Sequence, residues 1–214
     1  MPHPRRLERA AIIAATIEVL DERGLDDLSL HAIADRLGVR QPALYHHFPS
    51  KAALLDAAAA TVLDRAHTER LPQDGEPWQD FLTRNARSLR RALLSVRDGA
   101  RLIAATGPRA PEPAAALARI DHLQRQGFTD IEAVLASIAV SRYVIGCVLE
   151  QQSAPTQAIT ASATAESAAT AAPVESSPEV QRLQRLSEHL TQLGPDHEFD
   201  TGLHALIRGM SASA

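Results

Sequence analysis

The chain contains very few cysteines, lysines and aromatic residues. Its 214 residues include one cysteine, Cys147, and aromatic side chains make up 3%. A single cysteine excludes an internal disulfide framework and a zinc site built on paired cysteines. Lys51 is the one lysine among 22 lysine and arginine residues, and it follows a short segment that also holds one of the two tyrosines, Tyr45. This concentration of scarce residue types predicts a functional surface there.

Other absences narrow the class of protein. No run of about 20 apolar residues is free of charge, and the basic N-terminal segment MPHPRRLERA lacks the apolar core of a signal peptide. We therefore predict a cytoplasmic protein without a membrane segment. The sequence also lacks a nucleophile elbow, a phosphate-binding loop and an HExxH motif. No motif thus supports a catalytic residue, a metal site or a cofactor.

Helical periodicity recurs along the chain, and no stretch alternates convincingly at strand length. Ala10, Ile13, Ile17 and Leu20 fall on one helical face, and Gly24 supplies a stop. Apolar residues make up 45% of the chain, enough for a core. We predict an all-α fold, with later helices at 78–93, 97–106, 111–126, 129–152, 178–193 and 197–210. The segment 153–177, rich in Ala, Ser, Thr and Pro, predicts a flexible linker.

Two short helices are predicted between residues 29 and 49. Ser29 can cap the first, Gly38 ends it, Gln41-Pro42 opens the second, and Pro49 stops it. Two short helices joined by a glycine-containing turn and braced by a preceding helix are typical of a helix-turn-helix.

The second short helix carries many hydrogen-bonding side chains. Burying them would be costly, whereas in a major groove they can reach base edges or phosphates. They are Arg40, Gln41, Tyr45, His46 and His47. Lys51, at the start of the next helix, can hold a backbone phosphate. The local excess of basic residues, taken by itself, is as typical of an ordinary solvated surface as of a DNA-binding surface.

The stretch LGVRQPALYHHFPSKAALLDA resembles the DNA-binding signature of the tetracycline repressor (TetR) family. Further similarity to the family's ligand-binding domain covers QGFT and IGCVLEQQ, and in all it spans roughly residues 7–152 and returns at 199–210. The resemblance implies a helix-turn-helix domain at 1–50 and a ligand-binding and dimerisation domain at 51–214. It also implies a homodimer that binds a palindromic double-stranded DNA operator and is released by a small-molecule effector.

The resemblance extends to individual positions of the DNA-binding domain. Some match family positions that contact bases or backbone, namely Gln41, Pro42, Tyr45 and Lys51. His31 stands where tetracycline repressors carry a base-reading arginine, Arg40 replaces an acidic residue, and Ala43 replaces a threonine. These changes imply a different operator sequence. His31 can equally contact a phosphate or remain solvated.

In the second domain, residues that match family drug- or metal-site positions are His67, Asn85, Thr106 and Glu150. Ile103 stands where the family's metal-ligating histidine belongs, Arg119 replaces a drug-binding glutamine, and Leu89 replaces an aromatic residue. Isoleucine cannot ligate Mg²⁺. The resemblance therefore implies a ligand-binding site that takes a metal-free ligand in place of Mg²⁺–tetracycline, with Arg119 pairing an acidic group.

Alternatives remain for these residues and for the function. His67 can cap a helix, Asn85 can join two helices, Glu150 can pair with Arg142, and Ile103 can be simple core. A regulator that has lost small-molecule sensing is the second interpretation. An enzyme using His67 and Glu150 as acid and base is the third.

Overall fold

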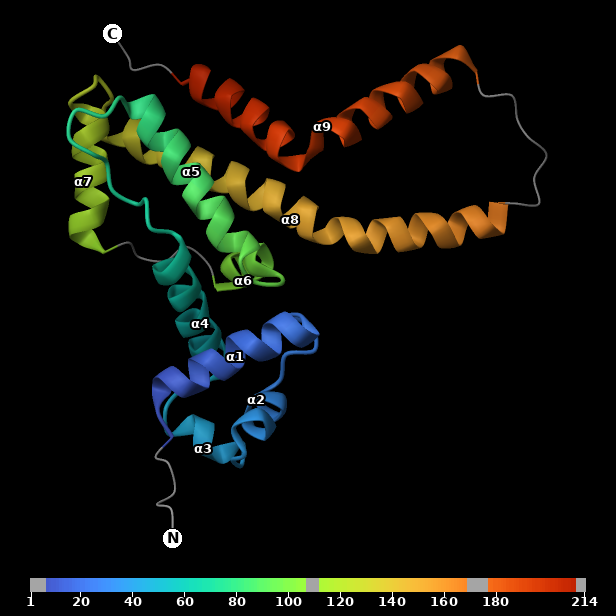
Figure 1. The fold of residues 1–214 in the computed structure, drawn as a ribbon. Coiled ribbons are helices and arrows are strands. Elements are labelled where there is room, and N and C mark those ends of the chain that lie inside the picture. Colours follow the sequence, from blue (N-terminus) through green and yellow to red (C-terminus); the bar gives the residue numbers. More distant parts are fainter. Residues whose placement is uncertain (1–6, 107–111, 169–176, 211–214) are drawn as a thin grey trace.

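The computed structural model describes residues 7–106, 112–168 and 177–210, and every regular element within them is a helix. This confirms the all-α prediction. Figure 1 shows how the helices succeed one another along the chain. They are α1 (Arg9–Arg23), α2 (Leu30–Leu37), α3 (Pro42–Tyr45), α4 (Lys51–Ala66), α5 (Trp78–Leu94), α6 (Gly99–Thr106), α7 (Pro113–Gln124), α8 (Asp130–Ala168) and α9 (Pro178–Arg208).

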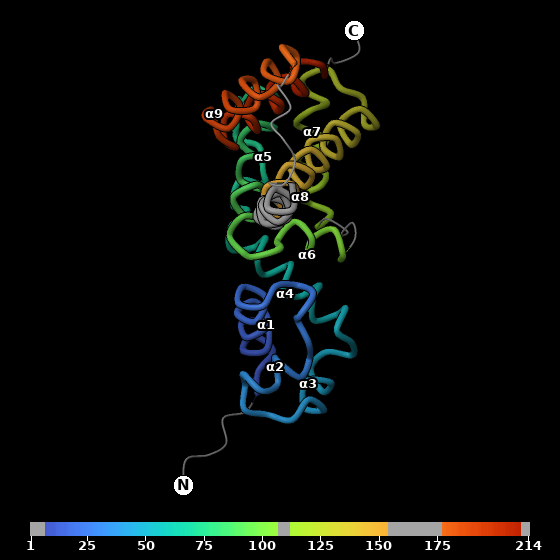
Figure 2. The backbone as a smooth tube through the Cα atoms, turned by 90° about the vertical axis from the view of Figure 1, so that its right-hand side faces the viewer, coloured from blue at the N-terminus to red at the C-terminus, as the bar shows by residue number. Residues whose placement is uncertain are grey.

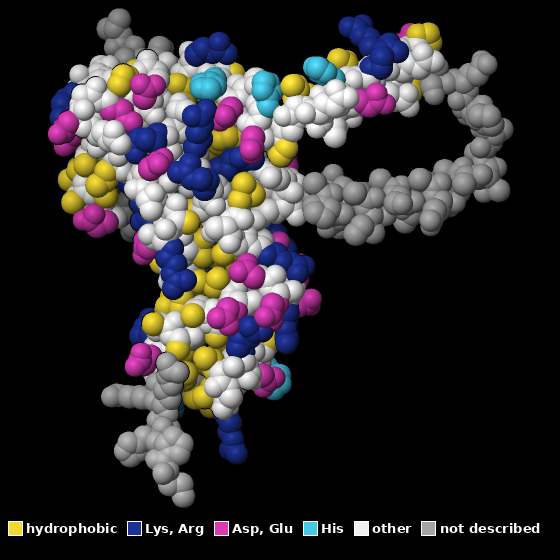
Figure 3. Space-filling view, in the orientation of Figure 1, with side chains coloured by type: hydrophobic (Ala, Val, Ile, Leu, Met, Phe, Trp, Pro, Cys, Tyr) yellow, Lys and Arg dark blue, Asp and Glu magenta, His cyan; other side chains and the backbone are white. Residues whose placement is uncertain are grey.

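The molecule has a small head and a larger body. In the ribbon of Figure 1 and the backbone tube of Figure 2, α1, α2 and α3 form the head at one end, α4 leads out of it, and α5 to α9 form the body. On the face drawn in Figure 3, acidic and basic side chains are interspersed over head and body. Charge alone therefore does not mark a binding surface on this face.

Two hydrophobic cores stabilise the molecule, one centred on the head and reaching α6, the other in the body. The head core includes Ile12, Leu20 and Ile33, and it continues into α4 through Leu54 and Val62. The helix that begins after the predicted boundary at residue 50 therefore completes the head.

The body core is built mainly on α5 and α8, with Phe81, Leu93 and Val144 among its buried residues. Ile103 packs against both cores, so it lies at the junction of head and body.

Helix α8 is longer than predicted. It was expected to end near residue 152, but its backbone remains helical to Ala168. The predicted linker at 153–177 thus begins inside this helix, and its residues 169–176 lie outside the described part of the chain. Alanine has the highest intrinsic helix propensity of the amino acids. The segment Asp130–Ser153 has a mean hydropathy of 1.7 and is long and apolar enough to cross a membrane.

Helix α9 contains a sharp bend, which is visible in Figure 1. Gly194 has a φ of 77°, and Pro195 follows it. Proline cannot donate the backbone hydrogen bond that a continuous helix needs. The bend separates the two closing helices predicted at 178–193 and 197–210.

Candidate nucleic-acid interface and ligand site

The head contains the predicted helix-turn-helix. The Ser29 hydroxyl accepts a hydrogen bond from the Ala32 backbone N–H at 3.1 Å and caps α2. Gly38 ends α2 with a φ of 66°, a left-handed conformation that glycine adopts without strain. Pro42 occupies the first turn of α3. Beyond α3, the Phe48 N–H still donates to the Leu44 carbonyl at 2.9 Å, so a helical turn continues past Tyr45.

Two apolar residues fix this short helix to the head. Leu44 and Phe48, four residues apart, are buried at 1% and 3% exposure. Side chains at this spacing lie on one helical face. The other faces are therefore left to the polar residues: Tyr45 is 50% exposed, and Arg40 and His46 are also exposed. Gln41 and Ala43 are half-buried, and Pro42 is exposed.

Two predicted DNA contacts already have partners within the chain. His31 Nε2 lies 3.3 Å from Asp35 Oδ2, and both side chains are largely exposed. The Lys51 ammonium donates to the Leu28 carbonyl. An ammonium has three donors, so Lys51 can hold this carbonyl and a phosphate together. A base or phosphate contact by His31 has to compete with Asp35.

Arg9 is a basic residue of the head that the sequence interpretation missed. Its guanidinium donates to the His47 carbonyl and lies 4.1 Å from the centroid of the Phe48 ring. This places a positive charge beside the end of the helix that carries Tyr45. The cluster of basic residues in MPHPRRLERA was the available signal, but only the fold shows which residue reaches Phe48.

In the body, two predicted ligand residues are connected around the chain that follows α4. His67 is the C-cap of α4, and its Nδ1 lies 3.0 Å from the buried Ser88 hydroxyl on α5. Ser88 also accepts the Glu69 N–H at 3.2 Å, and Asn85 donates to the Glu69 carbonyl at 3.0 Å. His67 and Asn85 thus share one polar network, and Arg119 lies near enough for its charge to act on His67.

The electrostatics of this network favour a neutral imidazole. Burial, followed by the positive charges of Arg70, Arg119 and Arg91, lowers the pKa of His67 to about 4. Burial, followed by the charge of Arg70, also lowers the pKa of Arg119. The charged neighbours that shift the pKa of these two groups are all arginines, two of which, Arg70 and Arg91, are paired with Asp64 and Glu69.

The remaining predicted ligand residues lie partly in the body core and partly on the surface. Leu89 is buried, and Ile103 packs against the same body core. Thr106, at the end of α6, donates to the Ile103 carbonyl at 3.0 Å. Glu150 is exposed on α8, and no ion pair among the described residues joins it to Arg142 or to the other predicted ligand residues.

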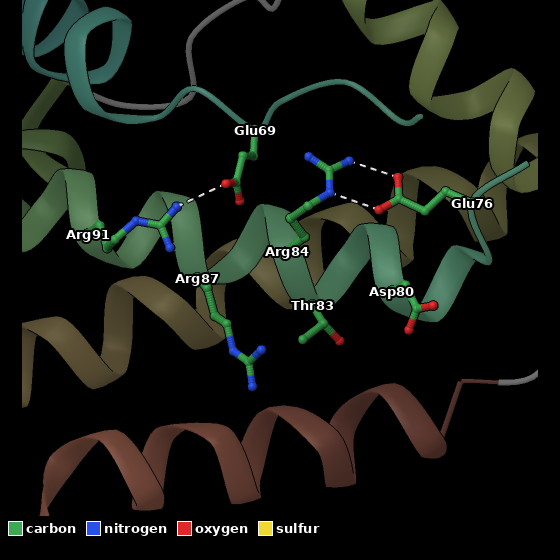
Figure 4. A pocket seen from close by; sticks show the side chains of 7 residues that line it. All are labelled: Glu69, Glu76, Asp80, Thr83, Arg84, Arg87 and Arg91. Carbon is green, nitrogen blue, oxygen red and sulfur yellow. Dashed lines mark hydrogen bonds and ion pairs between the residues drawn. The ribbon is translucent and has the colours of Figure 1, made fainter. Parts of the chain in front are cut away.

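A groove of about 410 Å³ lies elsewhere on α5, and none of the predicted ligand residues lines it. Figure 4 shows its charged side chains, several of which are paired. Arg84 contacts Glu76 at 2.7 Å, and Arg91 contacts Glu69 at 3.3 Å. Arg87 pairs with Asp200 of α9 at 2.9 Å. Because its arginines are matched by carboxylates, this groove is explained as a structural network.

We expect His67 to make stability depend on pH. Its folded pKa of about 4 lies below the unfolded value of 6.5, so the unfolded chain takes up a proton first as pH falls. Stability should fall between pH 6.5 and 4 and level off below. For this partly exposed group we expect a loss of about 1 kcal/mol between pH 7 and 5. Urea unfolding of wild type and His67→Gln at both pH values measures it. If the two proteins differ in free energy of unfolding by the same amount at both pH values, His67 is not the source of the pH dependence.

A set of polar contacts joins the start of α6 to the end of α1. Asp98 Oδ2 accepts the Leu25 N–H at 2.8 Å, and Arg101 pairs with Asp26 at 2.6 Å. The Arg97 guanidinium donates to the Glu22 carbonyl at 3.0 Å. Asp98 has a φ of 55°, an uncommon conformation for a residue other than glycine. We call Arg97, Asp98 and Arg101 the head–body latch, since they tie the body to the head.

Comparisons with known proteins agree with this architecture. Residues 12–58 match the family model "Bacterial regulatory proteins, tetR family", and residues 71–214 match "Tetracyclin repressor-like, C-terminal domain". The chain is 43% identical to the tetracycline repressor protein class G of Vibrio anguillarum, over 95% of this chain and 93% of that protein.

Solved structures are also similar. The TetR structure from Acinetobacter baumannii AYE is 41% identical, with a TM-score of 0.78, covering 95% of this chain and 96% of the other. TetR (class A) in complex with 5a,6-anhydrotetracycline and magnesium is 36% identical, with a TM-score of 0.69, covering 95% and 98%. Proteins of this family bind operator DNA as dimers and respond to small-molecule effectors, and they are not enzymes. The chain belongs to the TetR family of DNA-binding transcriptional repressors, with a helix-turn-helix head and a ligand-binding C-terminal domain.

Proposed function

We propose that the chain is a homodimeric repressor that a small molecule other than Mg²⁺–tetracycline releases from a palindromic operator in the cytoplasm. The observation that carries the DNA-binding part is the exposure of Tyr45 beside the buried anchors Leu44 and Phe48. This arrangement supports a helix that projects its polar faces into a major groove.

The exposed apolar faces of α8 and α9 support the dimer. Only 28% of the apolar segment Asp130–Ser153 is buried within the chain. Its exposed residues include Ile131, Leu135 and Ile138. Large exposed apolar surfaces mark interaction sites, and a second copy of the same helix offers the matching surface. We therefore assign this segment to the subunit interface and not to a membrane.

The residues present do not fit Mg²⁺–tetracycline. Ile103 is a hydrocarbon side chain packed against both cores, and it replaces the histidine expected to ligate the metal. Among the described residues, no group of three His, Cys, Asp or Glu side chains could hold a metal ion without the help of a ligand. Glu150, a predicted site residue, is exposed.

The ligand is tested by calorimetric titration with tetracycline, with and without MgCl₂. We expect no binding tighter than about 10 µM and no dependence on Mg²⁺, because a metal-ligating side chain is missing. Sub-micromolar, Mg²⁺-dependent binding would contradict the proposal. A thermal-shift screen of metal-free compounds then distinguishes the two remaining functions. A ligand-responsive repressor should be stabilised by at least one compound, whereas a regulator that has lost sensing should be stabilised by none.

The head–body latch supports transmission of ligand binding to the head. Arg97→Ala removes the contact of the guanidinium with the Glu22 carbonyl but leaves the helix-turn-helix untouched. With an effector from the screen, we expect at least a fivefold higher effector concentration for half-release of DNA, and operator affinity within twofold of wild type. Fluorescence anisotropy on labelled operator measures both. Equal inducibility would show that this contact is an ordinary surface bond.

A further inference from the structure

Arg70 and Arg119 are two arginines of the body whose charges are incompletely matched. Arg70 donates its Nε to the His67 carbonyl at 2.7 Å and its Nη1 to Asp64 at 3.0 Å. Its Nη2 is buried and has no hydrogen-bond partner. Arg119 is half-buried, and within the described residues no carboxylate pairs with it. A buried guanidinium N–H group without an acceptor is costly, so the unpartnered Nη2 of Arg70 needs a reason.

His67 adds a third donor to this pair. The Glu69 N–H donates to the Ser88 oxygen, and the Ser88 hydroxyl lies 3.0 Å from His67 Nδ1. A neutral imidazole in which Nδ1 accepts the Ser88 proton carries its ring hydrogen on Nε2, which is then available to donate. In that tautomer the two guanidiniums and the ring N–H are all donors, and the positive charge of Arg70 contributes, after burial, to lowering the pKa of Arg119.

The surroundings indicate the kind of anion. Leu89, which follows Ser88 on α5, and Ile103 are apolar residues of the same body core. Planar guanidinium groups match carboxylates in two-pronged geometry. An apolar wall beside a few convergent donors is typical of a site for an organic molecule. A carboxylate on such a molecule would satisfy the unpaired Nη2.

We propose that Arg70, Arg119 and His67 form the recognition site for a carboxylate group of an organic effector. This inference rests on the proposed ligand-responsive function, and it adds Arg70 and the chemical class of the ligand. Carboxylate binding offsets the repulsion between the two arginines and gives the buried donor its acceptor.

The test titrates the full-length protein at fixed ionic strength with a panel of aromatic monocarboxylates, their matched primary amides, and sodium phosphate. We expect at least one carboxylate to bind at least tenfold tighter than its amide. Arg70→Gln and Arg119→Gln should each weaken that binding at least tenfold. Arg65→Gln, at an exposed arginine of α4, is the matched control and should leave it unchanged.

The melting temperature of each ligand-free variant shows whether it folds. Because Arg119→Gln removes a repelled charge, the ligand-free variant should melt no lower than wild type. Equal binding of acids and amides, binding of phosphate alone, or carboxylate binding that survives Arg119→Gln would overturn the site. Failure of every carboxylate in the panel to bind would also overturn it.

Operator release, measured in parallel, separates this inference from the proposed function. If a carboxylate binds through the arginines but does not release the operator, the binding site is supported, and the carboxylate is not the effector. If an uncharged compound releases the operator, and Arg119→Gln does not change that release, the proposed repressor function stands and the carboxylate site is overturned.

Discussion

Tyr45→Ala should lower affinity for operator DNA at least about thirtyfold and leave the melting temperature unchanged. Tyr45 is 50% exposed, so its truncation removes little packing within the chain. Loss of a contact in the groove costs about 1 kcal/mol for each of the two recognition helices, and so about 2 kcal/mol for the dimer. The measurement is anisotropy on a duplex selected from a random pool by the wild-type protein.

The matched control for this variant is Gln73→Ala, an exposed polar residue of the body. It should bind the same duplex as tightly as wild type. Retention of operator affinity within threefold by Tyr45→Ala would remove the tyrosine from the interface. A parallel loss of melting temperature would assign it to the head core instead.

Gly99→Ala should lower the free energy of unfolding by more than about 3 kcal/mol, or roughly 10 °C in Tm. A Cβ at this buried glycine would lie 2.0 Å from the Leu93 carbonyl oxygen, which is backbone and cannot rotate away. Gln152 holds the same junction, since it donates to the carbonyls of Leu93 and Val96. The substitution therefore displaces the connection of α5, α6 and α8 together.

Gly209→Ala serves as the control for this variant. A Cβ there meets nothing closer than 3.4 Å, and the backbone has an ordinary helical conformation. Thermal unfolding at equal protein concentration should place it within about 0.5 kcal/mol of wild type. A Gly99→Ala protein as stable as the control would show that the α5–α6 junction is not rigid.

The helix boundaries were predictable because local chemistry determines them. Gly38 ends α2 and Ser29 caps it through bonds between near neighbours in sequence. Gly194 and Pro195 divide α9 for the same local reason. The extension of α8 to Ala168 was missed, because a segment rich in alanine and poor in large apolar residues is compatible with both helix and linker.

The site was predictable only in part, because its contacts join distant segments. Exposure of Tyr45 followed from the pattern of the short helix, with Leu44 and Phe48 as anchors. The bond between Asp98 and Leu25 spans 73 positions, and no local pattern indicates it. Arg70 was missed because its buried Nη2, which lacks a hydrogen-bond partner, depends on the packing of the folded chain.

The most direct test of the central claim is the stoichiometry and affinity of the protein on a palindromic duplex, measured by anisotropy and analytical ultracentrifugation at rising salt. We predict saturable binding of two chains to each duplex. The affinity should decrease steeply with salt, because the head contacts phosphates. A protein that remains monomeric and does not bind any selected duplex even at low salt would contradict the account.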